Sequence, residues 1–167
     1  LEGNGKKFYT DGPRIHEFLH EMNRETFGKY DDIITVGEMS STTLENSIRY
    51  SDPRSEELSM IFSFHHLRID YPSGNKWEIQ PFRFHDLKKN LFTWQREMEK
   101  GGGWNALFWY NHDQPRIVSR IGDEGRYRVE SAKMPATTIH GLEGTPYIYQ
   151  GDEIGMTNAG FTDISQY

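Results

Sequence analysis

Residues 33–39 read IITVGEM, a run of β-branched side chains that ends in a glycine and a glutamate. Short apolar runs of this kind predict strands that are buried on both faces of a parallel sheet. Gly37 gives the backbone freedom to turn and leaves room beside the carboxyl group of Glu38. We therefore predict a buried strand over 33–36, with Glu38 just beyond its carboxyl end.

The same alternation of short strand and amphipathic helix continues along the chain. Further strands are predicted at 60–64, 106–110 and 147–149. Helices are predicted to begin near residues 13, 42 and 87, and another is predicted over 131–142. This alternation is typical of a parallel sheet with helical crossovers. We expect an α/β fold, either an open doubly wound sheet or a closed (β/α)8 barrel.

Local signals mark the ends of these helices. Pro13 is typical of a first helical turn, and Thr42 with Glu45 matches a capping box. Three glycines at 101–103 are expected to end the long helix that begins near residue 87. Pro135 lies inside the helix predicted over 131–142, where a proline removes a backbone hydrogen bond. We expect this helix to kink or restart there.

Composition excludes several classes of function. The 167 residues carry a formal net charge of -6 and contain no cysteine. This excludes disulfides and thiolate zinc sites, and the acidic balance argues against a nucleic-acid partner. No apolar run approaches the roughly 18 residues of a membrane span, and the first residues lack a signal-peptide pattern. We expect no membrane segment and a cytoplasmic location.

Polar side chains follow every predicted strand. Glu38 follows the first, two histidines at 65–66 the second, NHDQ at 111–114 the third and QGDE at 150–153 the fourth. Because the carboxyl ends of parallel strands meet at one edge of a sheet, this predicts a polar cleft. A carboxyl group among apolar neighbours has a raised pKa and can act as a general acid. An equal alternative for Glu38 is helix capping or pairing with an arginine.

The run NHDQPR at 111–116 is the densest set of hydrogen-bonding groups. Sugars carry many hydroxyl groups, which Asn, Asp, His and Arg bind while aromatic rings provide stacking surfaces. Rings such as Phe64 lie close in sequence to the predicted strand ends. Side chains alternate in direction along a strand, so at least half of these rings are expected in the core instead.

Basic residues surround the segment 70–74. His66, Arg68 and Lys76 could together hold an anion, although composition alone favours ordinary surface charges. The histidines near this segment match no closed zinc spacing, so we predict no metal site and no cofactor.

Three segments resemble glycoside hydrolase family 13, the α-amylase family. They are the fifth-strand motif at 34–39, the seventh-strand motif at 108–116, and the eighth strand and its loop, in the oligo-1,6-glucosidase subfamily, at 144–158. The resemblance implies a retaining α-glucosidase with Glu38 as acid/base and Asp113 as the transition-state-stabilising aspartate. It also implies that His112 contacts a sugar hydroxyl and that Arg116 is a second-line contact.

Residues 37–43 and 64–72 are most similar to the trehalose-6-phosphate hydrolases of this subfamily. This implies that a phosphorylated disaccharide is the substrate, held by Arg68 and Lys76 beside the histidine pair. An oligo-1,6-glucosidase or dextran glucosidase is the alternative within the subfamily. A non-catalytic, amylase-like interaction module is a further alternative, against which the presence of both predicted carboxylates argues.

One family motif is missing from the chain. The nucleophilic aspartate lies in a fourth-strand motif of the Asp-Gly-Phe-Arg type, and the similar DGPR at 11–14 starts a helix with no strand before it. The resemblance therefore implies that 1–167 is the C-terminal half of a (β/α)8 barrel, strands five to eight. Such a fragment of the catalytic domain is expected to be inactive alone. Because a half barrel exposes two sheet edges, we expect a homo-oligomer that covers them.

Overall fold

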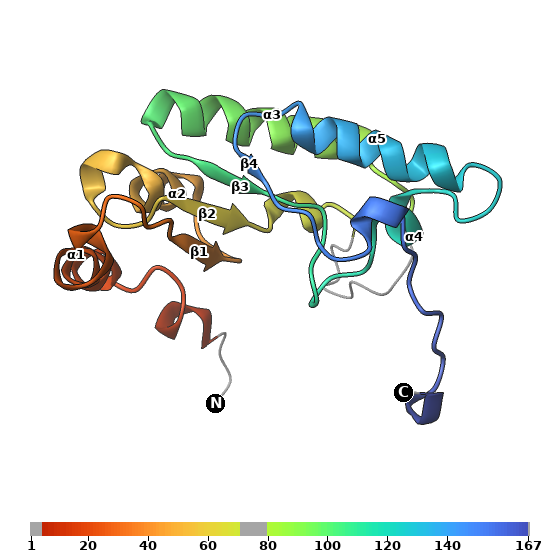
Figure 1. Cartoon of the computed structure of the whole chain (residues 1–167), viewed down its shortest axis with the longest axis horizontal. Coiled ribbons are helices and arrows are strands. Elements are labelled where there is room, and N and C mark those ends of the chain that lie inside the picture. Colours follow the sequence, from red (N-terminus) through yellow and green to blue (C-terminus); the bar gives the residue numbers. More distant parts are fainter. Residues whose placement is uncertain (1–4, 71–79, 167) are drawn as a thin grey trace. The chain divides into compact units, whose positions relative to one another are not determined.

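A computed structural model describes residues 5–70 and 80–166 (Figure 1). Its sheet has the order β1-β2-β3-β4, formed by β1 (Val36–Met39), β2 (Met60–Ser63), β3 (Asn105–Leu107) and β4 (Thr145–Pro146). β1 pairs in parallel with β2, and β2 pairs in parallel with β3. The predicted α/β fold with a parallel sheet is confirmed. Lys76 lies outside the described residues.

Five α-helices occur in the part of the chain that the structure describes. They are α1 (Ile15–Glu25), α2 (Leu44–Ser51), α3 (Phe84–Gly101), α4 (Ile117–Ile121) and α5 (Arg128–His140). Within 5–70 and 80–166, none of them is long and apolar enough to cross a bilayer.

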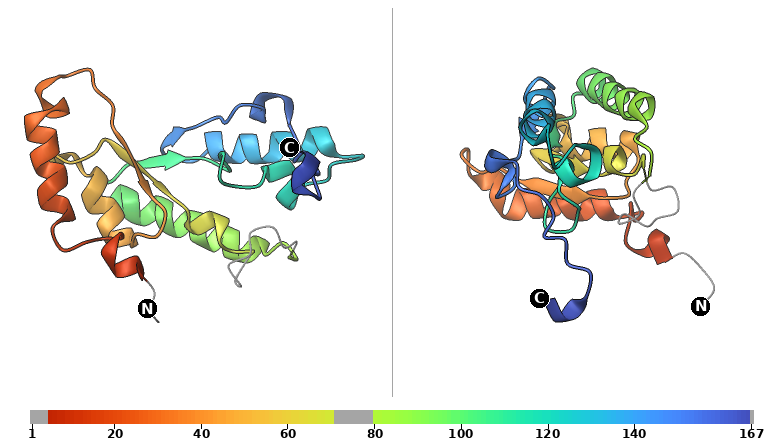
Figure 2. Two further views of the ribbon diagram at one scale, coloured as in Figure 1. Left: turned by 90° about the horizontal axis from the view of Figure 1, so that it is seen from below. Right: turned by 90° about the vertical axis from the view of Figure 1, so that its right-hand side faces the viewer.

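The chain divides into two compact units, each with its own packing. The first unit comprises residues 1–69, 83–107 and 143–145, and the second comprises 70–82, 108–142 and 146–167. In the first unit, α2 packs against β2 and α3 (Figure 2). Its core is formed by the side chains of Leu19, Tyr50, Ile61, Trp94 and Met98. Burial of each large apolar side chain contributes about 1.5–3 kcal/mol to the stability of the fold. This core therefore holds the strands of the first unit in place.

The second unit is built around the aromatic run that follows β3. Phe108, Trp109 and Tyr110 are all buried, as are Val118 of α4 and Ile139 of α5. These rings were predicted to extend the third strand, but the strand ends at Leu107. They act as the core of this unit instead.

Pro135 does not interrupt its helix. The prediction of a restart is wrong, because α5 runs unbroken from Arg128 to His140. The proline is fully buried, and its carbonyl oxygen accepts a hydrogen bond from Nε1 of Trp109 at 2.6 Å. Burial of the ring and this indole contact hold Pro135 within the helix, although its missing N–H removes one backbone hydrogen bond.

Strand boundaries differ from the predicted ones. β1 begins at Val36, and Ile33 and Ile34 are 47% and 72% exposed instead of buried. Hydrogen-bonded pairing with β2 defines the strand, so Glu38 lies within it and not beyond it. β4 likewise covers Thr145–Pro146, before the predicted 147–149. The apolar runs in the sequence thus predicted the position of each strand only to within a few residues.

The start of α2 also differs from prediction. Its N-cap is Thr43, whose hydroxyl accepts a hydrogen bond from the backbone N–H of Asn46 at 3.2 Å. Thr42, the predicted cap, is buried and donates its hydroxyl elsewhere, to Asp11. The long helix α3 ends as predicted, with Gly102 at a φ of 83° as its C-cap.

Candidate functional site

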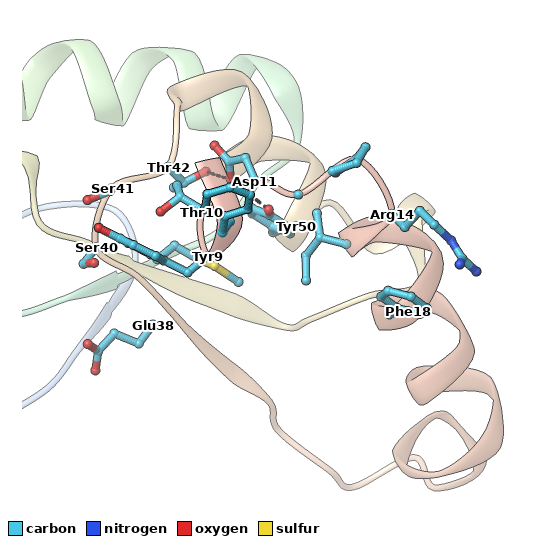
Figure 3. A pocket seen from close by; sticks show the side chains of 15 residues that line it. Tyr9, Thr10, Asp11, Arg14, Phe18, Glu38, Ser40, Ser41, Thr42 and Tyr50 are labelled. Carbon is cyan, nitrogen blue, oxygen red and sulfur yellow. Dashed lines mark hydrogen bonds between the residues drawn. The ribbon is translucent and has the colours of Figure 1, made fainter. Parts of the chain in front are cut away.

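Glu38 is the third residue of β1 and pairs in register with Phe62 of β2. It lines a cavity of about 390 Å³ together with Tyr9, Asp11, Ser40 and other residues of the first unit (Figure 3). The cavity opens at the carboxyl end of the strand, where a parallel α/β sheet usually binds its ligands. Glu38 therefore borders a ligand-sized space, and in Figure 3 its carboxyl group points away from Asp11 and Tyr50.

Gly37 is closely packed next to Glu38. A Cβ atom at Gly37 would lie 2.6 Å from Cδ1 of Leu58 and 2.8 Å from Cε of Met39. A larger residue would have to push the ends of these two side chains aside. The glycine is thus explained by close approach, and the backbone there needs no left-handed conformation.

A short 3₁₀ turn, His65–Leu67, follows β2; it contains His66, and Arg68 is its C-cap. Nη2 of Arg68 donates a hydrogen bond to Oγ of Ser41 at 3.1 Å, which joins this turn to the loop after β1. His66 is half-buried. The first unit therefore brings Arg68 and the loop next to Glu38 together, across 27 residues of sequence.

Phe64, a predicted sugar contact, is only 5% exposed. The next residue, His65, packs its ring against Trp94 with ring centroids 4.6 Å apart. Both rings thus contribute to the interior of the first unit, and a contact between Phe64 and a ligand stays a prediction.

The second unit presents the motif residues after β3 on a tight turn. Oδ1 of Asn111 accepts a hydrogen bond from the backbone N–H of Asp113 at 2.9 Å. Nε2 of His112 lies 3.5 Å from Oδ2 of Asp113, and the two side chains are 71% and 62% exposed. The two predicted sugar-binding groups are therefore adjacent and open to solvent.

Arg116 joins the segment after β3 to the segment after β4. Its Nη1 donates to the hydroxyl of Tyr110 at 3.1 Å and to the carbonyl oxygen of Gln150 at 3.0 Å. Its guanidinium also lies over the rings of Tyr110 and Tyr149, at 5.4 and 5.5 Å. Burial, followed by the hydrogen bond to Asp152, raises the pKa of Tyr110. These contacts make Arg116 a support for the turn at 111–116.

Sequence reasoning missed a buried ion pair in the second unit. Arg120 of α4 donates from both Nε and Nη2 to the carboxylate of Asp70, and the Nε distance is 2.7 Å. The two side chains are only 7% and 11% exposed. The partners lie 50 residues apart, and α4 was not predicted, so no local pattern linked them. Across 5–70 and 80–166, no group of three His, Asp or Glu side chains could hold a metal ion.

Replacing Arg120 by alanine is expected to destabilise the protein by about 3–5 kcal/mol, because the carboxylate of Asp70 would stay buried without its cation. Thermal or urea unfolding measures the effect. The matched control is Arg96→Ala, since Arg96 is 72% exposed in its pair with Glu97 and its loss should leave the free energy of unfolding nearly unchanged. Equally small losses of stability in both variants would contradict a stabilising role for the pair between Arg120 and Asp70.

Comparison with known proteins places these features in a family. The model of the α-amylase catalytic domain matches residues 1–165. Trehalose-6-phosphate hydrolase of Bacillus subtilis is 66% identical over 166 residues, and that of Escherichia coli is 60% identical over 167. Oligo-1,6-glucosidase of Parageobacillus thermoglucosidasius is 56% identical over 164 residues.

Solved structures of similar enzymes superpose closely on this chain. The crystal structure of trehalose-6-phosphate hydrolase from Bacillus licheniformis superposes with a TM-score of 0.91 at 68% identity, covering 99% of this chain and 30% of that one. Isomaltulose synthase from Erwinia rhapontici gives 0.88 at 38% identity. The matches to the two curated hydrolases include 99% and 100% of this chain. They span only 29% and 30% of the length of those two proteins. On this evidence of sequence and fold, the chain belongs to the α-amylase catalytic-domain family of glycoside hydrolases.

Proposed function

We propose that these 167 residues form part of a retaining α-glucosidase that hydrolyses trehalose 6-phosphate to glucose and glucose 6-phosphate. The observation that carries the proposal is the position of Glu38, on a parallel strand and in a cavity, beside a loop that is hydrogen-bonded to Arg68. The high identity to proteins named trehalose-6-phosphate hydrolase supports the substrate. The longer protein to which the residues would belong is called the parent protein below.

The four strands correspond, in this proposal, to strands five to eight of a (β/α)8 barrel. The sheet order β1-β2-β3-β4 follows the chain order, and each strand is followed by helical segments, as in a barrel. The remaining strands would come from other residues of the parent protein.

Glu38 is the acid/base of the proposed reaction. It protonates the glycosidic oxygen as the leaving sugar departs, and it then removes a proton from the water that hydrolyses the glycosyl intermediate. Asp113 accepts hydrogen bonds from the ring hydroxyls and stabilises the positive charge of the oxocarbenium-like transition state, with His112 bound to the same sugar. The carboxylate that forms the covalent bond to the sugar comes from outside these 167 residues.

Arg68, His66 and Lys76 bind the phosphate group of the substrate in this proposal. A guanidinium group presents N–H donors in a fork that matches phosphate oxygens, and the hydrogen bond to Ser41 orients it beside the loop after β1. The formal net charge of -6 makes a local group of cations useful here, since an acidic chain otherwise repels a phosphorylated sugar.

The double variant Arg68→Ala/Lys76→Ala of the parent protein is expected to lower kcat/KM for trehalose 6-phosphate by at least about 100-fold. Each lost charge-assisted hydrogen bond is worth about 1.5–3 kcal/mol, whereas isomaltose, which has no phosphate, should change by less than about threefold. Steady-state kinetics on both substrates measure the difference. Arg96→Ala, at an exposed pair, serves as the control for loss of a cation.

Two results would contradict the proposal that this group of cations binds the phosphate of the substrate. One is a double variant that cleaves trehalose 6-phosphate as well as the wild type does. The other is a wild-type parent protein that cleaves isomaltose equally well or better. That second outcome favours an oligo-1,6-glucosidase, the activity named for relatives at 49–56% identity.

A further inference from the structure

Asp11 has a backbone conformation that most residues avoid. Its φ is 49°, in the left-handed region, in which asparagine and aspartate are enriched among residues other than glycine. It stands in the segment that leads into α1, directly before Gly12 and Pro13. Such an outlier persists only where surrounding contacts hold it in place, and it commonly lies near a functional site.

The carboxylate of Asp11 joins three segments of the first unit. Its Oδ1 accepts hydrogen bonds from the hydroxyl of Thr42 at 2.7 Å and from that of Tyr50 at 2.8 Å. Its Oδ2 accepts from the backbone N–H of Thr43 at 3.3 Å. One side chain before α1 is therefore bound to the loop after β1 and to α2, as Figure 3 shows for Thr42 and Tyr50.

The protonation states of the two groups suit this contact. Burial by itself raises the pKa of Asp11, but hydrogen bonds from Asn46, Thr42, Tyr50 and the backbone of Thr43 outweigh it and hold the pKa below its usual value. Burial of Tyr50, followed by its hydrogen bond to Asp11, raises the pKa of the phenol. At neutral pH the carboxylate accepts and the phenol donates.

The loop that Asp11 holds begins directly after the strand of Glu38. Ser40 and Ser41 lie between the end of β1 and Thr42, and they line the same cavity as Glu38 and Asp11. Ser41 also receives the hydrogen bond from Arg68. Pairing with β2 therefore fixes the loop at one end, and Asp11 fixes it at the other.

We propose that Asp11 is a positioning residue, which holds the loop after β1 so that the carboxyl group of Glu38 lies where the reaction needs it. The proposal rests on the proposed function, because it concerns the same acid. A displacement of a catalytic group by about 1 Å can cost about 100-fold in rate, so a distant anchor can have a large effect on turnover. Because Asp11 acts through the loop, its loss should change kcat more than KM.

The test compares Asp11→Ala with Asp11→Asn in the parent protein. Alanine removes every acceptor, whereas asparagine tolerates the left-handed backbone and keeps an oxygen for Thr42 and Tyr50. We expect Asp11→Ala to lower kcat for trehalose 6-phosphate by about 10–100-fold with KM changed by less than about threefold. Asp11→Asn should restore kcat to within about threefold of the wild type.

Two further variants keep the test decisive. Asp52 also accepts backbone and side-chain hydrogen bonds, from Arg54, but it is the C-cap of α2, at the opposite end of that helix from the loop, so Asp52→Ala controls for a general loss of stability. Thr42→Val removes one contact to Asp11 and should also lower kcat. This variant replaces Asp11→Ala in the test if Asp11→Ala fails to fold. Melting temperatures identify the folded variants.

Hydrogen exchange separates this proposal from the proposed function. In Asp11→Ala, the amides of 40–43 should exchange faster, and this readout does not depend on activity. A wild-type parent protein without α-glucosidase activity would overturn the proposed function, and with it the role of Asp11 in turnover. An active wild type whose Asp11→Ala and Thr42→Val variants keep kcat, or lose only as much as Asp52→Ala, would overturn the positioning role alone.

Discussion

Glu38→Gln in the parent protein is expected to lower kcat/KM for trehalose 6-phosphate by at least about 1,000-fold, within the range that a general acid contributes. The amide of glutamine has nearly the same size as the carboxyl group but cannot donate a proton to the glycosidic oxygen. Since Glu38 lies at the surface of a cavity and not in the core, the fold should be unaffected.

Two measurements accompany this variant. Binding of substrate should remain within about threefold of the wild type, because an interaction that acts only in the transition state leaves ground-state binding intact. Glu45→Gln makes the same chemical change on α2, at an exposed position in the first helical turn, and should keep full activity. A Glu38→Gln enzyme that cleaves trehalose 6-phosphate as well as the wild type does would mean that Glu38 is not the acid.

The 167-residue chain on its own is expected to show no glycosidase turnover. The proposed two-step reaction needs a carboxylate nucleophile, and the sequence lacks the fourth-strand motif that carries it in the family. Loss of a covalent nucleophile commonly costs about a million-fold in kcat, which is below detection in an ordinary assay.

The purified chain can be assayed with p-nitrophenyl α-glucoside and with trehalose 6-phosphate. Its own Glu38→Gln variant is the control and should give the same background. Turnover at the rates of about 1–1,000 s⁻¹ that enzymes commonly reach would contradict the assignment of the nucleophile to other residues. A parent protein that also lacked activity would favour the non-catalytic module instead.

The parts of the fold that depend on local pattern could be predicted from the sequence. The apolar run before Gly37 indicated a strand close to the position of β1, and a long helix predicted to begin near residue 87 is present as α3. Strand ends could not be predicted as well, because pairing with a neighbour decides them. Ile34 reads as a strand residue but lies outside β1 and is 72% exposed.

The contacts that support the site could not be predicted, because they join distant residues. Asp70 and Arg120 are 50 positions apart, and Asp11 meets Tyr50 across 39. No periodicity links such partners, and in the sequence Asp11, Asp70 and Arg120 resemble ordinary surface charges. Glu38 and Asp113 could be singled out because Glu38 lies near the carboxyl end of β1 and Asp113 lies in the segment after β3, within the α/β alternation.

The most direct test of the account compares two leaving groups in Glu38→Gln. p-Nitrophenolate departs without being protonated, whereas the sugar released from trehalose 6-phosphate needs a proton from the acid. We predict that kcat/KM falls at least about 100-fold more for trehalose 6-phosphate than for p-nitrophenyl α-glucoside, relative to the wild type. Equal losses on both substrates would contradict the role of Glu38 as the general acid.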